Sequence, residues 1–363
     1  MEIRPHDSIL RAFNIDGAGT EIKKFGSGHI NNTFLVETRN ESQLILQRIN
    51  TAVFKEPAAI ALNQRMAANY LSLYHPEYLF ITPVPTVDGQ DLFVFNDEYW
   101  RVIPFIAGSL TVDQADDPSQ AFQAAQQFGR LARYLDGIDL QEFKPTIPNF
   151  HNLTLRYNAF EEAVQNAGAE RKATAEELIR AFLQHKDIAA TYERLTNNPQ
   201  FPDRLMHHDT KINNVLLQKG TYKGLCVCDL DTLMPGKIIS DLGDMVRTYV
   251  CPVSEEEPDI SRIRIRQEYY HALMDGYLSE IGDVLTEVEK EHLFYAGPFM
   301  IYMQGLRFLT DYLNGDVYYP VKYPQHNYNR AINQLTLLER LLEKEAVLQE
   351  IISTCLGKAR KDI

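Results

Sequence analysis

Residues 207–214 read HHDTKINN and arrange four polar residues as H-x-D-x-K-x-x-N. Transfer of a phosphoryl group to a hydroxyl needs a carboxylate that accepts the hydroxyl proton and cations that hold the phosphates in line. Asp209 can be that base, Asn214 can bind Mg²⁺ through its amide oxygen, and Lys211 can lie near the γ-phosphate. We expect His207 to brace the loop rather than to perform chemistry. The segment therefore predicts a catalytic loop for phosphoryl transfer.

A second acidic segment, LCVCDLD at residues 225–231, follows this loop. Asp229 ends an apolar strand-like run, 20 residues after Asp209. A carboxylate at that strand end would face the same cleft as the loop, and a kinase requires a second acidic Mg²⁺ ligand. The alternative for Asp229 or Asp231 is an acid that caps a turn. The preceding motif favours Asp229 as the metal ligand.

The N-terminal segment FGSGHINNTF, residues 25–34, joins two strand-like runs. Gly26 and Gly28 would let backbone N–H groups approach phosphates. Asn31 stands where a third glycine would complete G-x-G-x-x-G, and asparagine tolerates left-handed dihedrals. The alternative is a plain β-hairpin turn, but the position near the start of a strand-rich region favours a phosphate loop.

The cation for the nucleotide is harder to find. The strand-like run LILQRIN, residues 44–50, offers Arg48 or Gln47 but no lysine, and the helical stretch AAIALNQRMAANYL after it has no glutamate. If Leu44 and Leu46 face the cleft, strand alternation directs Arg48 there as well. We therefore predict that Arg48 contacts the α- and β-phosphates, since a guanidinium binds phosphate well. A solvated strand residue is the alternative.

The distribution of elements predicts an α+β fold with a small β-rich N-lobe and a larger, mostly helical C-lobe. The N-lobe, residues 1–105, has five short β-like runs and one helix near 57–74, and the C-lobe is residues 106–363. Helices are expected near 121–135, 155–167, 173–195, 241–249, 258–281, 285–314 and 326–350. YWRVIPFIAG, residues 99–108, fits a hinge in which backbone groups around Ile103 and Phe105 pair with adenine.

These motifs resemble the aminoglycoside phosphotransferase and choline kinase superfamily, whose catalytic loop is H-x-D-x-x-x-x-N. The resemblance covers nearly the whole chain and implies a protein-kinase-like two-lobed fold that uses ATP and Mg²⁺. It implies that Asp209 is the base and that Asn214 and Asp229 are metal ligands. In SDLGDMVRT, residues 240–248, Asp241 would steady the catalytic loop. Lys211 departs from the many members that carry histidine there.

The segment QGLRFLTDYLNGDVYYP, residues 304–320, bears on the acceptor. Arg307 and Asp311 lie four residues apart on one helical face. The alternative to a binding role is that these two form a surface ion pair and that Asp316 is an ordinary turn residue. Together with GSGHINNTF, HHDTKINNVLL and LDTLMPGK, this segment is similar to the bacterial N-acetylhexosamine 1-kinases. That resemblance implies that Arg307, Asp311 and Asp316 bind GlcNAc or GalNAc, which is phosphorylated at the anomeric hydroxyl. A choline, homoserine or aminoglycoside kinase, or a catalytically inactive nucleotide-binding protein, remains an alternative.

Composition limits the classes of partner. The formal charge of −13 argues against nucleic acid. The sequence contains no run of about 18 apolar residues, so we expect no membrane span. The segment MEIRPHDSILRAFNI does not have the pattern of a secretory signal. We expect a cytoplasmic enzyme, a monomer or weak homodimer, whose partners are ATP and a small sugar. Its cysteines, Cys226, Cys228, Cys251 and Cys355, are expected to be reduced core residues.

Overall fold

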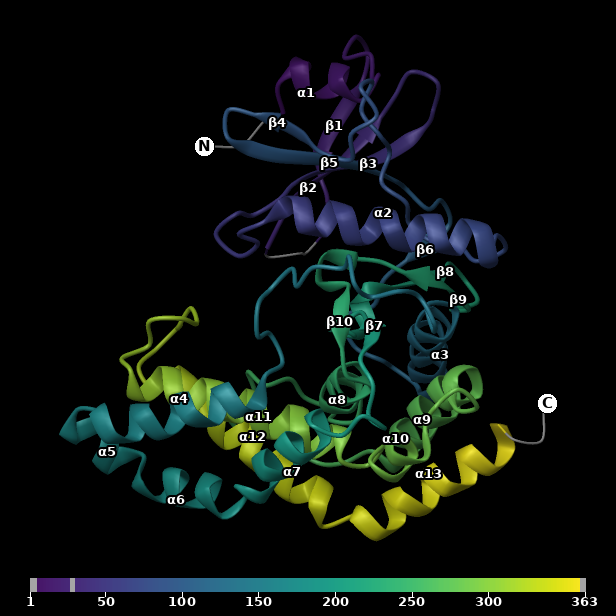
Figure 1. The fold of residues 1–363 in the computed structure, drawn as a ribbon. Helices are drawn as coiled ribbons and strands as arrows, with labels where there is room; N and C mark the ends of the chain where they lie inside the picture. Colours follow the sequence, from purple (N-terminus) through teal and green to yellow (C-terminus); the bar gives the residue numbers. More distant parts are fainter. Residues whose placement is uncertain (1–4, 27–29, 360–363) are drawn as a thin grey trace.

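The structure is a computed structural model that describes residues 5–26 and 30–359. An N-terminal β-sheet lies above a larger helical part (Figure 1), which confirms the predicted α+β, kinase-like fold. The sheet is antiparallel throughout. Its strands, in spatial order, are β1 (Glu21–Lys24), β2 (Asn32–Glu37), β3 (Gln43–Arg48), β5 (Glu98–Pro104) and β4 (Phe93–Phe95).

The register of β3 against β5 assigns side chains to the two faces of this sheet. Leu46 is opposite Val102, whereas Gln47 is opposite Arg101. Leu46 and Val102 are buried in a small core with Trp100 and with residues of α1 (Asp7–Ala12). Because side chains alternate along a strand, Gln47 and Arg101 lie on the other face, toward the helical part.

Helix α2 (Pro57–Tyr74) crosses the molecule between the sheet and the helical part (Figure 1). Pro57 at its first turn suits a helix start, where no N–H partner is lost. The buried Asn63 side chain donates to the carbonyls of Lys144 at 2.7 Å and Leu233 at 2.8 Å, and its oxygen accepts the Lys144 N–H. Helix α2 is thereby fastened to the C-lobe.

Most of the helical part is built from eleven α-helices within the described ranges. These are α3 (Pro118–Tyr134), α4 (Leu153–Asn166), α5 (Ala169–Thr174), α6 (Glu176–Gln184), α7 (Asp187–Thr196), α8 (Ile238–Tyr249), α9 (Gln267–Ile281), α10 (Glu287–Glu291), α11 (Ala296–Leu313), α12 (His326–Leu342) and α13 (Glu345–Ala359). The stretches 173–195, 285–314 and 326–350, each expected as one helix, are broken by short turns. Apolar periodicity continues across these turns, so it does not reveal them.

Two glycines allow α3 and α9 to pack closely. A Cβ on Gly129 would lie 2.6 Å from the Tyr277 carbonyl oxygen, and one on Gly276 would lie 2.4 Å from that of Phe122. Each helix thus presents a glycine to the backbone of the other, and a larger residue at either position would force the helices apart.

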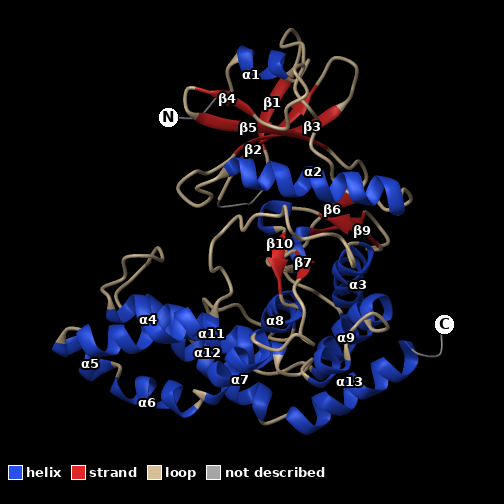
Figure 2. Cartoon of the chain, in the orientation of Figure 1, coloured by secondary structure: helices blue, strands red, loops and turns tan. Residues whose placement is uncertain are grey.

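Short strands lie on both sides of residues 207–214, the predicted catalytic segment, just below the N-terminal sheet (Figure 2). They form a two-stranded sheet of β7 (Arg204–Met206) and β10 (Met234–Gly236), and a three-stranded sheet of β6 (Ser109–Leu110), β8 (Val215–Gln218) and β9 (Gly224–Val227). None of the helices in the described part of the chain is both long and apolar enough to cross a membrane. The four cysteines are unpaired.

Candidate active site

The catalytic segment lies between β7 and β8 and is held by two acids of α8. The Asp241 carboxylate accepts the backbone N–H of His207 at 3.0 Å and of His208 at 2.7 Å. Asp244 accepts the N–H of Thr210 at 3.0 Å. His208 has a φ of 67°, a left-handed conformation that costs a non-glycine residue energy. Its bonded N–H helps to keep the loop in this shape.

His207 is buried and joins the catalytic segment to the end of β9. Its Nε2 lies 2.9 Å from the Cys228 carbonyl, and its Nδ1 lies 3.3 Å from the Asp209 N–H. A neutral ring that carries its proton on Nε2 satisfies both contacts. Burial lowers the pKa of His207, which favours this neutral form.

Asp209 is half-buried and lies in the segment that α8 holds. Lys211 Nζ lies 3.1 Å from Asp209 Oδ1, and the Lys211 side chain is 47% exposed. The arrangement places one acceptor for a proton beside one cation. That pair is what in-line phosphoryl transfer to a hydroxyl requires from a catalytic loop.

The donor set at Asn214 and Asp229 fits a divalent cation. Asn214 donates its amide N–H to the Asp209 carbonyl at 2.8 Å, so its Oδ1 is left to bind another group. The Cys228 N–H donates to the Asn214 carbonyl at 2.8 Å, so Asp229, the next residue, follows directly from this contact. Although the Asp229 side chain is exposed, desolvation, followed by the charges of Asp231 and Asp209, raises its pKa to about 7. A cation bound among these carboxylates would relieve their repulsion.

Three segments of the N-lobe converge on the buried carboxylate of Asp231. Arg101 of β5 forms an ion pair with it at 2.5 Å, and both side chains are almost fully buried. Asn31 donates to it at 2.7 Å and Gln64 of α2 at 3.3 Å. Arg101 also donates to the Gln47 side chain. Desolvation and the neighbouring carboxylates raise the pKa of Asp229, and the charge of Arg101 opposes that rise in part. Arg101 is therefore the guanidinium that the sheet directs toward the carboxylates of the cleft.

Arg48 does not have the orientation that alternation was expected to give it. It does share a face with Leu44 and Leu46, but that face packs on α1 rather than facing the cleft. Its guanidinium pairs with Glu98 and with the Asn32 side chain. Gln47, the other candidate, lies on the cleft side beside Arg101.

The other residues expected to contact the nucleotide lie near the ends of strands β1 and β5. Gly26 has a φ of 79°, the left-handed conformation that glycine adopts without strain. Gly28 lies outside the described residues. Ile103 is opposite Ile45 near the end of β5, and Phe105 follows the strand, with its ring edge-on to Phe25 at a centroid distance of 5.9 Å. The adenine contact of this hinge stays a prediction.

The acidic residues expected to bind the acceptor are used within the protein. Buried Asp311 accepts the backbone N–H groups of residues 317, 318 and 319 and the side chain of Asn327, all within 3.0 Å. Asp316 pairs with Arg171 at 2.6 Å and accepts a bond from Asn327. Both carboxylates therefore shape the segment 314–319, and the four donors saturate Asp311. Arg307 makes no ion pair with Asp311 but bonds to Gln304 at 3.1 Å.

Residues 21–277 match the family described as the phosphotransferase enzyme family, which is most of the chain. The chain belongs to this family. The matched residues include the segment 207–214 and Asp229.

Solved structures share the fold at low sequence identity. An amicoumacin kinase in complex with AMP-PNP, Ca²⁺ and amicoumacin is 15% identical with a TM-score of 0.60, covering 95% of this chain and 92% of its own. A microcompartment-associated aminopropanol kinase is 17% identical with a TM-score of 0.62, covering 93% and 97%. Choline kinase from Cryptosporidium parvum is 14% identical with a TM-score of 0.56, covering 96% and 98%. At these identities the likeness shows the phosphotransferase fold and leaves the acceptor open.

Sequence reasoning missed the residues whose role depends on distant partners. Asp244 could have been found, because it lies three residues after Asp241 on the same helix. Arg101 stands in the hinge segment that was read only for its backbone, and Asp231 was read only as a turn cap. Nothing local in the sequence indicates that these two form a buried ion pair.

Proposed function

We propose that this phosphotransferase transfers the γ-phosphoryl group of ATP to the anomeric hydroxyl of N-acetylhexosamines such as GlcNAc and GalNAc. Asp209 accepts the hydroxyl proton, and Lys211 neutralises charge on the transferred group. The observation that carries the kinase chemistry is the braced loop that sets Asp209 beside both Lys211 and the Asn214–Asp229 donor pair. The amicoumacin kinase, which holds AMP-PNP and Ca²⁺, supports a nucleotide and a divalent cation as cofactors.

In this proposal Asn214 and Asp229 hold Mg²⁺, which would neutralise charge on the phosphates. Arg101, rather than Arg48, contacts the phosphates from the sheet, because it alone of the two is directed toward the carboxylates of the cleft. Backbone groups of the loop at Gly26 approach the phosphates, and those near Ile103 and Phe105 pair with adenine.

The acceptor assignment rests on the four segments that are similar to N-acetylhexosamine 1-kinases. It is also supported by a cavity between α4, α11 and the segment 314–319, which the guanidiniums of Arg156 and Arg307 line. Their charge disfavours a cationic acceptor such as choline or an aminoglycoside, and suits a molecule rich in hydrogen-bond acceptors. Arg307 contacts the sugar, whereas Asp311 and Asp316 position the adjoining segment 314–319.

Phosphorus NMR of the product tests this proposal. With ATP and Mg²⁺, GlcNAc or GalNAc should give a sugar 1-phosphate, the 1-O-methyl glycoside should be inert, and the 6-deoxy sugar should still react. A 6-phosphate, or turnover of choline or an aminoglycoside with none of any hexosamine, would contradict the acceptor assignment and leave the phosphotransferase fold untouched.

A further inference from the structure

Thr210, the residue that follows Asp209, is fully buried and makes three hydrogen bonds to α8. Its backbone N–H donates to Asp244 Oδ2 at 3.0 Å, and its carbonyl accepts the Tyr249 hydroxyl at 2.9 Å. Its own hydroxyl donates to the Asp241 carbonyl at 2.7 Å. The backbone on the C-terminal side of Asp209 therefore has the orientation that α8 imposes on it.

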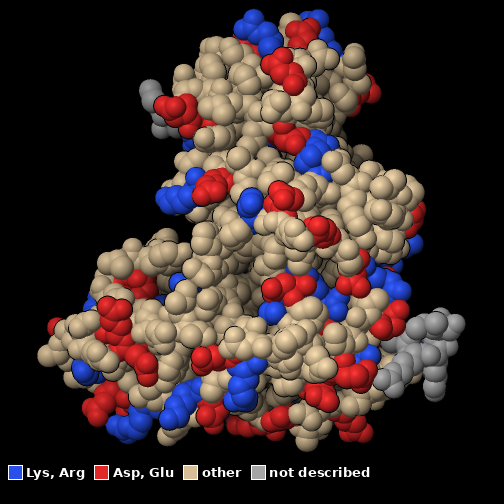
Figure 3. Space-filling model, viewed as in Figure 1, with Lys and Arg blue, Asp and Glu red and all other residues tan. Residues whose placement is uncertain are grey.

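Asp244 has a second partner, Arg247, which lies three residues later in the same helix. Charged side chains of both signs are interspersed over the face shown in Figure 3, but this pair is buried, with the Arg247 and Asp244 side chains only 14% and 7% exposed. Arg247 Nη2 lies 3.0 Å from Asp244 Oδ1, whereas the Thr210 N–H bonds to Oδ2. Each carboxylate oxygen of Asp244 thus has its own donor, one from Arg247 and one from the catalytic segment.

The charges of this pair depend on each other. Desolvation raises the pKa of Asp244, and the charge of Arg247 is the largest effect that opposes this rise. Desolvation also acts against the charge of Arg247, but Asp244 and Glu255 outweigh it and raise the pKa of Arg247. Glu255 lies in the loop 250–266 between α8 and α9, and its Oε2 is 2.6 Å from Arg247 Nη1. Removing Arg247 would leave Asp244 as an unpaired buried acid.

Arg247 also affects which carboxylate Lys211 binds. Lys211 Nζ lies 3.1 Å from Asp209 Oδ1. Although desolvation opposes the charge of Lys211, Asp209 and then Asp244 raise its pKa, and Arg247 acts against them. Both carboxylates therefore attract Lys211, and the charge of Arg247 offsets that of Asp244. This balance favours the contact of Lys211 with Asp209.

We propose that Arg247 is a positioning residue for phosphoryl transfer, which acts through Asp244 on the backbone next to Asp209. An ionised Asp244 accepts the Thr210 N–H in a charge-assisted hydrogen bond, which is roughly twice as strong as a neutral one. Arg247 keeps Asp244 ionised, and Glu255 holds the Arg247 guanidinium from its other end. The proposal rests on Asp209 as the base, but it does not depend on which hydroxyl compound is the acceptor.

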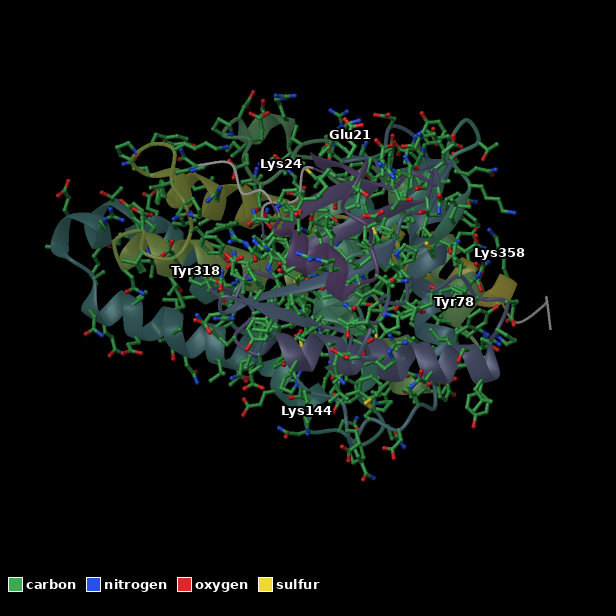
Figure 4. All side chains as sticks on the ribbon, turned by 90° about the horizontal axis from the view of Figure 1, so that it is seen from above. Glu21, Lys24, Tyr78, Lys144, Tyr318 and Lys358 are labelled. Atoms are coloured by element: carbon green, nitrogen blue, oxygen red, sulfur yellow. The ribbon has the colours of Figure 1, made fainter. Side chains whose placement is uncertain are left out.

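The loop 250–266 offers a control of the same kind. Its Glu256 pairs with Lys322 at 2.8 Å and also with Arg330 of α12. Lys322 follows Tyr318 in the chain, and Tyr318 lies on the opposite side of the molecule from Lys358 of α13 in Figure 4. The Arg330 pair thus belongs to the same loop, but it joins that loop to α12 instead of to the catalytic segment.

Steady-state kinetics of Arg247→Gln and Arg330→Gln test the proposal. Each variant loses a guanidinium that pairs with a glutamate of the loop, and the two side chains are similarly buried, at 14% and 12% exposed. Arg247→Gln should lower kcat by about 10-fold or more, as expected when a charged hydrogen bond is lost. The KM for ATP should stay within about threefold, because the change affects the base and not nucleotide binding. Arg330→Gln should leave kcat within about twofold of wild type.

Further variants show whether the effect passes through Asp244. In Asp244→Asn the side chain still presents an oxygen to the Thr210 N–H, but it carries no charge that needs Arg247. Arg247→Gln should therefore cost much less kcat in the Asp244→Asn background than in the wild type, and equal losses would overturn the proposal. If Arg247→Gln does not fold, Arg247→Lys is compared with Arg330→Lys. Lysine keeps the charge but loses the planar fork, so only Arg247→Lys should lower kcat, by about threefold or more.

Hydrogen exchange gives a readout that needs no acceptor. Three backbone N–H groups of the segment 207–214 donate to carboxylates of α8. A peptide that spans this segment should exchange about 10-fold faster or more in Arg247→Gln, but at the wild-type rate in Arg330→Gln. Unchanged exchange, or a kcat within about twofold of wild type in Arg247→Gln, would overturn the proposal. If Asp209→Asn stays active, the assignment of the base fails instead, and exchange still shows whether Arg247 holds the segment.

Discussion

Replacing Arg101 or Arg48 by glutamine distinguishes the two candidate cations of the N-lobe. The Arg101–Asp231 pair is 2.5 Å long, and its side chains are only 4% and 2% exposed. Removing one partner of a buried pair leaves an uncompensated charge and costs about 3–5 kcal/mol. The side chains of the Arg48–Glu98 pair are 26% and 37% exposed, and such a pair contributes about 0–1 kcal/mol.

The single tryptophan of the chain makes the measurement local. Trp100 is buried in the N-lobe core and lies opposite Arg48 in the sheet register, so its fluorescence reports unfolding of this lobe. For an m-value of about 2 kcal/mol/M, Arg101→Gln should lower the urea midpoint by about 1.5–2.5 M, and Arg48→Gln by less than about 0.5 M. Equal shifts would refute the assignment of Arg101 to the buried network.

A double variant and nucleotide kinetics complete the test. Adding Asp231→Asn to Arg101→Gln removes the stranded charge, so it should restore part of the lost stability. If Arg101 contacts the phosphates, its loss should raise the KM for ATP by roughly 10- to 150-fold, the usual effect of losing a charged hydrogen bond. An unchanged KM for ATP in a folded Arg101→Gln protein would exclude that contact.

Three further substitutions test the site and the packing. Asp209→Asn should lower kcat by about 10² or more while nucleotide binding persists, and activity within about threefold of wild type would remove Asp209 from the mechanism. Asp229→Ala should weaken Mg²⁺-dependent nucleotide binding in calorimetry, because charge on the phosphates is then poorly neutralised, and unchanged affinity would exclude it as a ligand. Gly129→Ala should destabilise the fold by about 1–3 kcal/mol, since its Cβ meets the Tyr277 carbonyl. Gly357→Ala, which meets nothing within 4 Å in α13, is its control, and equal stability of the two variants would contradict the close-packing argument.

The sequence predicted the position of candidate site residues best where those residues are close together in the chain. The polar pattern of 207–214 and the acid at the end of a strand both follow from local spacing, and the structure brings Asp209, Asn214 and Asp229 together. The strand runs of the N-lobe were also found, because alternation is a local property.

The sequence did not show which face of a strand meets the other lobe, or which groups a polar side chain contacts. Alternation grouped Leu44, Leu46 and Arg48 correctly on one face, but which face meets the other lobe depends on α1, a short helix that the sequence did not reveal. Asp311 lies four residues after Arg307, a spacing that suggested that both bind the acceptor. Its donors are backbone groups of a segment six to eight residues later, whose fold no helical pattern predicts.

The Asp231 network has a mechanical consequence for nucleotide binding. Protein kinases pair a strand lysine with a helix glutamate, both within the N-lobe. Here Arg101 of the N-lobe pairs instead with Asp231 of the C-lobe, two residues from the proposed metal ligand Asp229. Phosphates bound near Arg101 would compete with Asp231 for its guanidinium, which also joins the two lobes. Nucleotide binding and the contact between the lobes would therefore be coupled through Arg101. The side chains of the partly buried Asn31 and the buried Gln64 still donate to Asp231 when Arg101 is shared with the phosphates.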